Sequence, residues 1–146
     1  MPTAARALSA LMFAALAGIA AALAIPYLPD GTPPGRMVPA SALIGLLCGW
    51  LSMGRLVGQS YPLAAGNGFR TTVVTIFWVV TAFSVWEMLE RSYERRYRGI
   101  TDALVGTFDI ALGYLRLLAA PEVAGVLVLG GIVAGLLAEA AHRRWR

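Results

Sequence analysis

The residue best placed to do chemistry in this sequence is Glu139, which lies inside a long apolar run near the C-terminus. A carboxylate within a membrane-crossing segment is energetically costly and is often found in proton relays or subunit contacts. Glu139 also precedes Arg143 by one helical turn, and a local ion pair is therefore the competing structural interpretation. Histidine is the side chain that most often serves as a pH-sensitive group, but a lone histidine beside arginines, such as the neighbouring His142, is usually an interfacial residue.

A second set of charges recurs every seven residues, at Asp102, Asp109 and Arg116. This spacing places all three on one stripe of a helix. The stripe would line a polar path if that helix crossed a membrane, and it would face water if the helix lay at the membrane surface. Because charges at the centre of a bilayer cost roughly 3 kcal/mol each on insertion scales, the sequence favours an amphipathic surface helix over residues 100–120.

The single cysteine, Cys48, stands among apolar residues and has no basic neighbour in the sequence. A reactive thiol needs a lowered pKa and access to solvent, so this position predicts a packing role. A single cysteine also excludes an internal disulfide and a cysteine-cluster metal site. The other polar residues show neither metal-ligand spacing nor a Ser/His/Asp set. We therefore expect no catalytic residues, no metal and no cofactor, and hence no enzyme.

Four long apolar runs, separated by the charged clusters, are the elements that position these residues. Hydrophobic residues make up 58% of the 146-residue chain and charged residues only 14%. A soluble domain of this size cannot bury so much apolar surface, whereas a bilayer core takes roughly 20 apolar residues per helix. We predict an all-α fold, a single-domain integral membrane four-helix bundle with the amphipathic helix between spans three and four. The predicted spans are residues 7–28, 38–54, 71–90 and 121–141.

Glycine pairs at four-residue spacing occur in two of the predicted spans. Gly45 and Gly49 form a GxxxG pair in the second span, and Gly131 and Gly135 form another in the fourth. Glycines in this pattern let two helices approach closely in a membrane. We therefore expect both pairs to pack helices together, within the protein, with a second copy or with another membrane protein.

The connectors between the spans carry turn signals and charge. Gly66-Asn67-Gly68 predicts a turn before the third span, and Asp30–Gly35 predicts a short hairpin after the first. After the third span, residues 87–98 contain no helix breaker, so we expect the helix to continue into water. Glu87 and Arg91 lie four residues apart in this extension and make a favourable helical pair.

The charge distribution bears on partners and location. The net charge is +4, and the arginines lie at the ends of apolar runs, which disfavours nucleic-acid binding and suits contact with a lipid bilayer. Arginines are equally numerous on the two sides of the predicted topology, but the Pro/Gly-rich first hairpin favours both termini in the cytoplasm. Residues 1–24 also resemble a signal peptide, although the length of the apolar run favours a retained span.

Residues spread over the whole chain resemble a known family. They are Met1–Ala5, Pro29–Pro33, Gly49-Trp50, Met53–Arg55, Phe77-Trp78, Glu87-Met88, Arg91-Ser92, Arg96-Tyr97, Ala134–Glu139 and Arg143–Trp145. In these the chain is similar to the TrgA family of small alphaproteobacterial membrane proteins, which is associated with tellurite resistance. The resemblance implies a multi-pass inner-membrane protein that supports tellurite resistance, and it carries over no catalytic or binding residue. Leu56 departs from the pattern, because a second basic residue commonly follows Arg55, and this weakens any oxyanion site there.

Two other functions fit the same residues. The first is ion or oxyanion transport that uses Glu139 and the stripe of Asp102, Asp109 and Arg116. The second is assembly of another membrane complex, for which only the small size of the protein argues.

Overall fold

The computed structural model describes residues 2–28, 34–94 and 97–145, and this part of the chain is built from helices without strands. The predicted all-α class is confirmed. Four helical segments are long and apolar enough to cross a membrane, namely Ala4–Tyr27, Pro34–Leu56, Tyr61–Tyr93 and Pro121–Arg144. The hairpin predicted at Asp30–Gly35 falls mostly outside the described residues.

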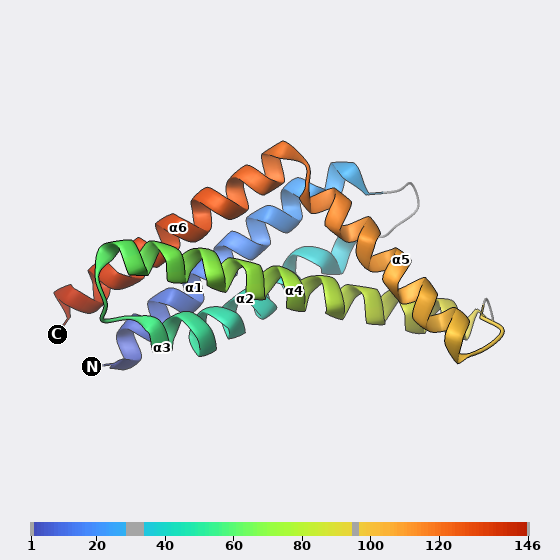
Figure 1. Ribbon diagram of the computed structural model, residues 1–146, viewed down its shortest axis with the longest axis horizontal. Coiled ribbons are helices and arrows are strands. Elements are labelled where there is room, and N and C mark those ends of the chain that lie inside the picture. Colours follow the sequence, from blue (N-terminus) through green and yellow to red (C-terminus); the bar gives the residue numbers. More distant parts are fainter. Residues whose placement is uncertain (1, 29–33, 95–96, 146) are drawn as a thin grey trace.

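Each span is built from one long helix or from short helical segments that follow one another directly. The first contains α1 (Pro2–Ala24) and the short η1 (Ile25–Tyr27), and the second contains η2 (Pro34–Arg36), α2 (Met37–Cys48), the π-helical η3 (Gly49–Met53) and α3 (Gly54–Leu56). The third is α4 (Tyr61–Tyr93), and the fourth is α6 (Pro121–Arg144). Figure 1 shows that α1 begins and α6 ends at the same end of the molecule.

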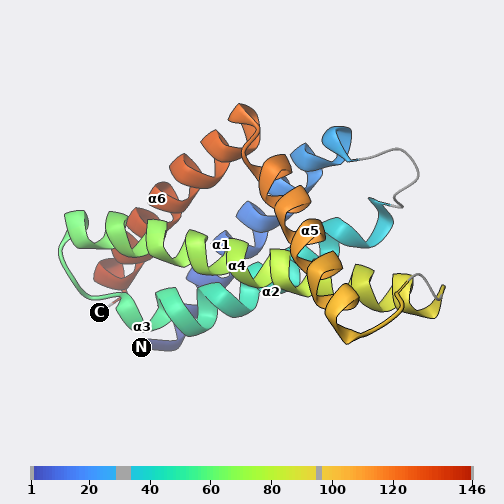
Figure 2. The ribbon, with the colours of Figure 1, turned by 45° about the vertical axis from the view of Figure 1, so that its right-hand side comes forward.

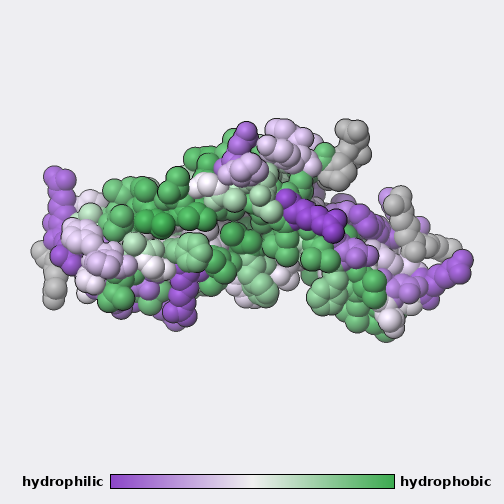
Figure 3. Space-filling model, turned by 45° about the horizontal axis from the view of Figure 1, so that its top comes forward, coloured by the Kyte–Doolittle hydropathy of each residue, from purple (hydrophilic) through white to green (hydrophobic). Residues whose placement is uncertain are grey.

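The core lies where α1 meets α2, η3 and α6. One buried cluster contains Phe13, Leu16, Met53, Ala134 and Ala138, and a second lies nearer the opposite end of α1, around Ala21 and Val123. In a space-filling view hydrophobic residues cover much of the middle of the molecule, and hydrophilic residues lie at its two ends and in a patch along the upper middle (Figure 3). This distribution suits a protein whose middle lies in hydrocarbon and whose ends meet water.

The glycine pair of the second span faces α1. A Cβ atom on Gly49 would lie 2.6 Å from the backbone oxygen of Ser9, and one on Gly45 would lie 2.7 Å from the Cβ of Ala17. The Ser9 hydroxyl also donates a hydrogen bond of 3.2 Å to the backbone oxygen of Gly49. The two helices thus approach so closely that their backbones and small side chains form the contact.

The glycine pair of the fourth span faces α4, and this contact corrects one prediction. The turn predicted at Gly66-Asn67-Gly68 is wrong, because these residues lie inside α4, which begins at Tyr61 rather than near Thr71. Pro62 occupies the first turn of α4, where proline favours a helix start. Gly68 lies against Gly135, where an added Cβ on Gly68 would come within 2.9 Å of the Gly135 Cα. The glycine therefore serves close packing and not chain reversal.

The end of α4 also differs from the prediction of a helix through residue 98. It ends at Tyr93, and the chain then turns back into α5 (Ile100–Leu118), which packs beside the end of α4 (Figure 2). The ring of Tyr97 occupies the space beside Gly106, since a Cβ there would lie 2.7 Å from its Cε1 atom. The end of α4 at Tyr93 thus goes together with a contact between Tyr97 and α5.

The predicted amphipathic helix is present as α5, and it has three distinct faces. Ile110 is buried against the protein, whereas Leu104, Phe108 and Leu115 are exposed on the outer side. The charged stripe of Asp102, Asp109 and Arg116 lies between these two faces and is exposed. An apolar outer face beside a charged stripe is the pattern of a helix at a membrane surface, and that position stays a prediction.

Candidate functional site

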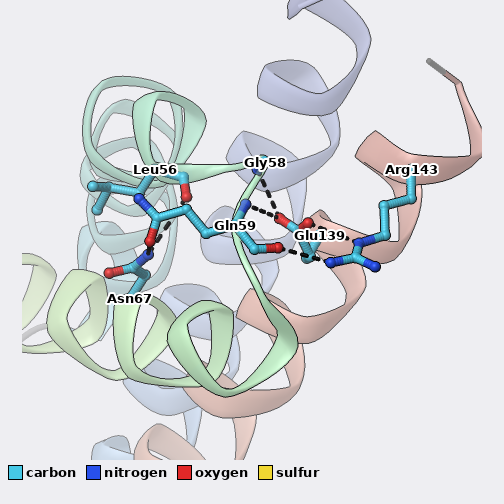
Figure 4. A network of polar contacts seen from close by, with 6 residues as sticks. All are labelled: Leu56, Gly58, Gln59, Asn67, Glu139 and Arg143. Atoms are coloured by element: carbon cyan, nitrogen blue, oxygen red, sulfur yellow. Dashed lines mark hydrogen bonds and ion pairs between the residues drawn. The ribbon is translucent and has the colours of Figure 1, made fainter.

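Glu139 is almost fully buried on α6, with 1% of its surface exposed, and its carboxylate is held by three donors. Oε2 accepts hydrogen bonds from the backbone N–H of Gly58 at 2.7 Å and of Gln59 at 3.3 Å. Oε1 accepts one from the Nε atom of Arg143 at 3.0 Å, which is also an ion pair (Figure 4). Such charge-assisted bonds are stronger than neutral ones and compensate for the burial of the charge.

The two backbone donors belong to the connector between α3 and α4. Gly58 has a φ of +101°, a conformation that side chains with a Cβ rarely adopt. With Gly58 in this conformation, successive N–H groups point at one oxygen, which is the geometry of a small anion-binding nest. The connector thus binds the Glu139 carboxylate through two backbone N–H groups, in the way that such a nest binds an anion.

Arg143 holds the same connector from the other side. Its Nη2 atom donates a hydrogen bond of 2.9 Å to the backbone oxygen of Gln59, and its guanidinium lies 4.5 Å from the centre of the Tyr61 ring. The amide nitrogen of Asn67 adds weaker bonds to the backbone oxygen of Leu56 and to the Gln59 side chain (Figure 4). The arrangement ties the start of α4 to the end of α6.

This geometry favours the structural interpretation of Glu139. The ion pair with Arg143 follows from their i,i+4 spacing, but the contacts with Gly58 and Gln59 are about 80 residues away in sequence, and no local pattern indicates them. Protonation of Glu139 would remove the negative charge that strengthens these three hydrogen bonds, so proton transfer at this carboxylate would weaken the attachment of the connector.

A second polar group, which sequence reasoning identified only in part, lies between α4 and α5. Glu87 and Arg91 form the expected i,i+4 ion pair. The other oxygen of Glu87 accepts a hydrogen bond of 3.0 Å from the hydroxyl of Tyr114, whose ring lies 6.0 Å from that of Phe83. Glu87, Arg91 and Tyr114 line a cavity of about 290 Å³, and Asp109 of α5 also lines it.

The raised pKa of Tyr114 leads to a testable prediction. Burial, followed by the charge and hydrogen bond of Glu87, raises the pKa of Tyr114 above its ordinary value of 10.0. The folded state therefore favours the neutral phenol, and this stabilisation is fully present below the unfolded pKa and is lost as pH rises through the folded pKa. We expect Tyr114→Phe to remove part of the decline in stability above pH 10, measured as melting temperature against pH.

An exposed tyrosine provides the control for this prediction. Tyr93 is 88% exposed, so Tyr93→Phe is expected to leave the alkaline decline unchanged. If the two variants gave the same profile, Tyr114 would not be the group responsible.

The structure separates the other residues singled out in the sequence. All three residues of the stripe are exposed, and of them only Asp109 lines the cavity between α4 and α5. Cys48 is buried, as expected for a packing residue. In residues 2–28, 34–94 and 97–145, no group of three or more His, Cys, Asp or Glu side chains is arranged to hold a metal ion.

No protein-family model, curated protein or solved structure matches this chain.

Proposed function

We propose that this chain is a non-enzymatic, multi-pass protein of a bacterial inner membrane that supports tellurite resistance through contacts with membrane partners or a second copy of itself. The resemblance of residues along the whole chain to the TrgA family supports the tellurite part. The observation that supports a non-catalytic role is the Glu139 carboxylate, because its three donors all come from its own chain.

The surfaces left for such contacts are the outer faces of the helices. Both glycine pairs already pack against neighbouring helices of the same chain, so they are not free to bind a partner. On α4, by contrast, Phe77 and Trp78 are 61% and 54% exposed, and on α5 Phe108 is 70% exposed. These aromatic side chains face either lipid or a membrane partner.

Deletion of the gene tests this proposal. We expect the minimum inhibitory concentration of tellurite to fall in the deletion strain and to be restored by the wild-type gene. A gene that carries Asp102→Asn is also expected to restore tellurite tolerance, because this carboxylate is exposed and lies outside the cavity and the core. Unchanged tolerance in the deletion strain, at a normal growth rate, would contradict the proposal.

Ion or oxyanion transport is the second candidate, and the charged residues Arg91 and Asp109, which line the cavity between α4 and α5, support it. It requires purified protein in liposomes to move tellurite or protons faster than empty liposomes, with loss of flux in Glu139→Gln. A flux equal to that of empty liposomes would exclude it.

The assembly function requires a reproducible partner after crosslinking and affinity purification, and the absence of one would count against it.

A further inference from the structure

The cavity between α4 and α5 lies where a lipid headgroup would be found. Tyr27 and Leu28, which line one wall, stand where the first apolar span ends. Glu87 and Arg91 come from the last turns of α4, which is the third span, and the opposite wall is α5 with its exposed apolar outer face. A span end marks the boundary between hydrocarbon and headgroups, so the cavity opens at headgroup depth.

The charges in the cavity are mixed, with an excess of carboxylates. Glu87 is engaged by Arg91 and Tyr114, whereas Asp109 makes no hydrogen bond or ion pair within the described residues. Arg91 contacts Glu87 through one nitrogen, and a guanidinium carries five N–H donors. The cavity therefore presents an uncompensated acceptor on α5 and a cationic donor group on α4.

Apolar and aromatic residues also line the cavity. Leu28, Ile110 and Leu117 border the cavity, and Tyr27 and Tyr114 add aromatic rings. Tyrosines at such a position present an apolar ring and a polar hydroxyl, which suits the membrane–water boundary. A ligand with a charged head and an apolar body matches this combination better than a small inorganic ion.

We propose that this cavity binds the headgroup of a phospholipid that carries a primary ammonium, such as phosphatidylethanolamine. The ammonium donates to the Asp109 carboxylate, the phosphate accepts from Arg91, and the glycerol end lies against Leu28 and Leu117. A quaternary ammonium has no N–H to donate and satisfies Asp109 less well. The proposal does not depend on the role in tellurite resistance.

Binding of short-chain ligands to the full-length protein in detergent micelles tests the proposal. The probes are dihexanoyl phosphatidylethanolamine, dihexanoyl phosphatidylcholine and hexylammonium. Binding is measured as the rise in melting temperature, with a thiol-reactive dye that reports unfolding because the single cysteine, Cys48, is buried in the fold. We expect phosphatidylethanolamine to bind more tightly than phosphatidylcholine.

Two matched variants distinguish the site from general surface charge. Asp109→Asn is expected to weaken binding of phosphatidylethanolamine by about tenfold or more, the cost of losing one hydrogen bond to a charged group. Asp102→Asn makes the same charge change on the same stripe outside the cavity, and binding is expected to stay unchanged. Native mass spectrometry of the lipid retained by each variant gives a second readout that is independent of stability.

Each remaining result either supports or overturns the proposal. Equal binding of phosphatidylcholine, or equal weakening by the two variants, would overturn it in favour of nonspecific attraction. Binding of hexylammonium as tight as that of phosphatidylethanolamine, with loss in Asp109→Asn, would overturn the lipid source and assign the site to a soluble amine. Weak binding of hexylammonium beside tight binding of phosphatidylethanolamine would support the role of the phosphate.

Discussion

Gly135→Ala is expected to lower the free energy of unfolding by about 2 kcal/mol, the middle of the range for overpacking in a tight contact. An added Cβ would meet the backbone oxygen of Ala64, the Cα of Gly68 at 2.9 Å and the nitrogen of Gly68 at 3.1 Å. All three atoms belong to the backbone of α4. A change of rotamer cannot relieve the contact, and the two helices have to move apart.

Gly125→Ala on the same helix is the matched control. No atom outside its local surroundings lies within 4 Å of a Cβ added at Gly125. Alanine is favoured over glycine in a helix interior by up to about 1 kcal/mol, so this variant is expected to keep or raise stability. Thermal unfolding in micelles compares the melting temperatures of the two variants. A melting temperature that stays the same or rises in both would show that the crossing of α4 and α6 at Gly68 and Gly135 tolerates the added methyl group.

The partner glycine of α4 allows the contact to be tested from both sides. Gly68→Ala is expected to destabilise like Gly135→Ala, whereas Gly66→Ala, where an added Cβ has open space, is not. Because Gly68 and Gly135 lie at the same crossing, the double variant is expected to cost less than the sum of the single variants. Full additivity would mean that the two residues act at separate contacts.

The same crossing shows why part of the fold escaped prediction from the sequence. The apolar runs predicted the spans because run length alone indicates a membrane helix. Gly66-Asn67-Gly68 was ambiguous, since glycine serves both turns and close helix contacts. The residue that decides between the two uses is Gly135, on a helix far along the chain. Local pattern does not contain that information.

The polar contacts divide in a similar way. Glu139 with Arg143 and Glu87 with Arg91 were predictable because i,i+4 residues meet on any helix. The hydrogen bond from Tyr114 to Glu87 depends on the chain turning back after Tyr93, and the sequence indicated a longer helix instead. The stripe of α5 was visible in the sequence, but which of its charges enters the cavity depends on how α5 packs.

Glu139→Gln is expected to lower the free energy of unfolding by about 1–3 kcal/mol, which is the cost of leaving a buried hydrogen-bond donor without an acceptor. The wild-type carboxylate accepts on both oxygens, from the connector on one side and from Arg143 on the other. Glutamine has one acceptor oxygen and one NH₂ group. Whichever way it turns, its NH₂ group faces either Arg143 or the N–H groups of Gly58 and Gln59.

Glu122→Gln is the control on the same helix. Glu122 is exposed, and its one hydrogen bond within the described residues is a long one of 3.4 Å, accepted from the hydroxyl of Tyr27. An exposed substitution of this kind is expected to change stability by about 0.5 kcal/mol or less. Protease sensitivity of the exposed connector around Gly58 and Gln59 gives a local readout, and it should rise in Glu139→Gln alone.

The combination of stability and flux separates the two roles considered for Glu139. A structural carboxylate predicts that Glu139→Gln melts earlier and is cleaved faster at the connector, and that any loss of tellurite tolerance follows the amount of folded protein. A transport carboxylate predicts loss of flux in liposomes at full stability. The three donors around Glu139 favour the first result, because a glutamine can accept from the connector or from Arg143 but not from both.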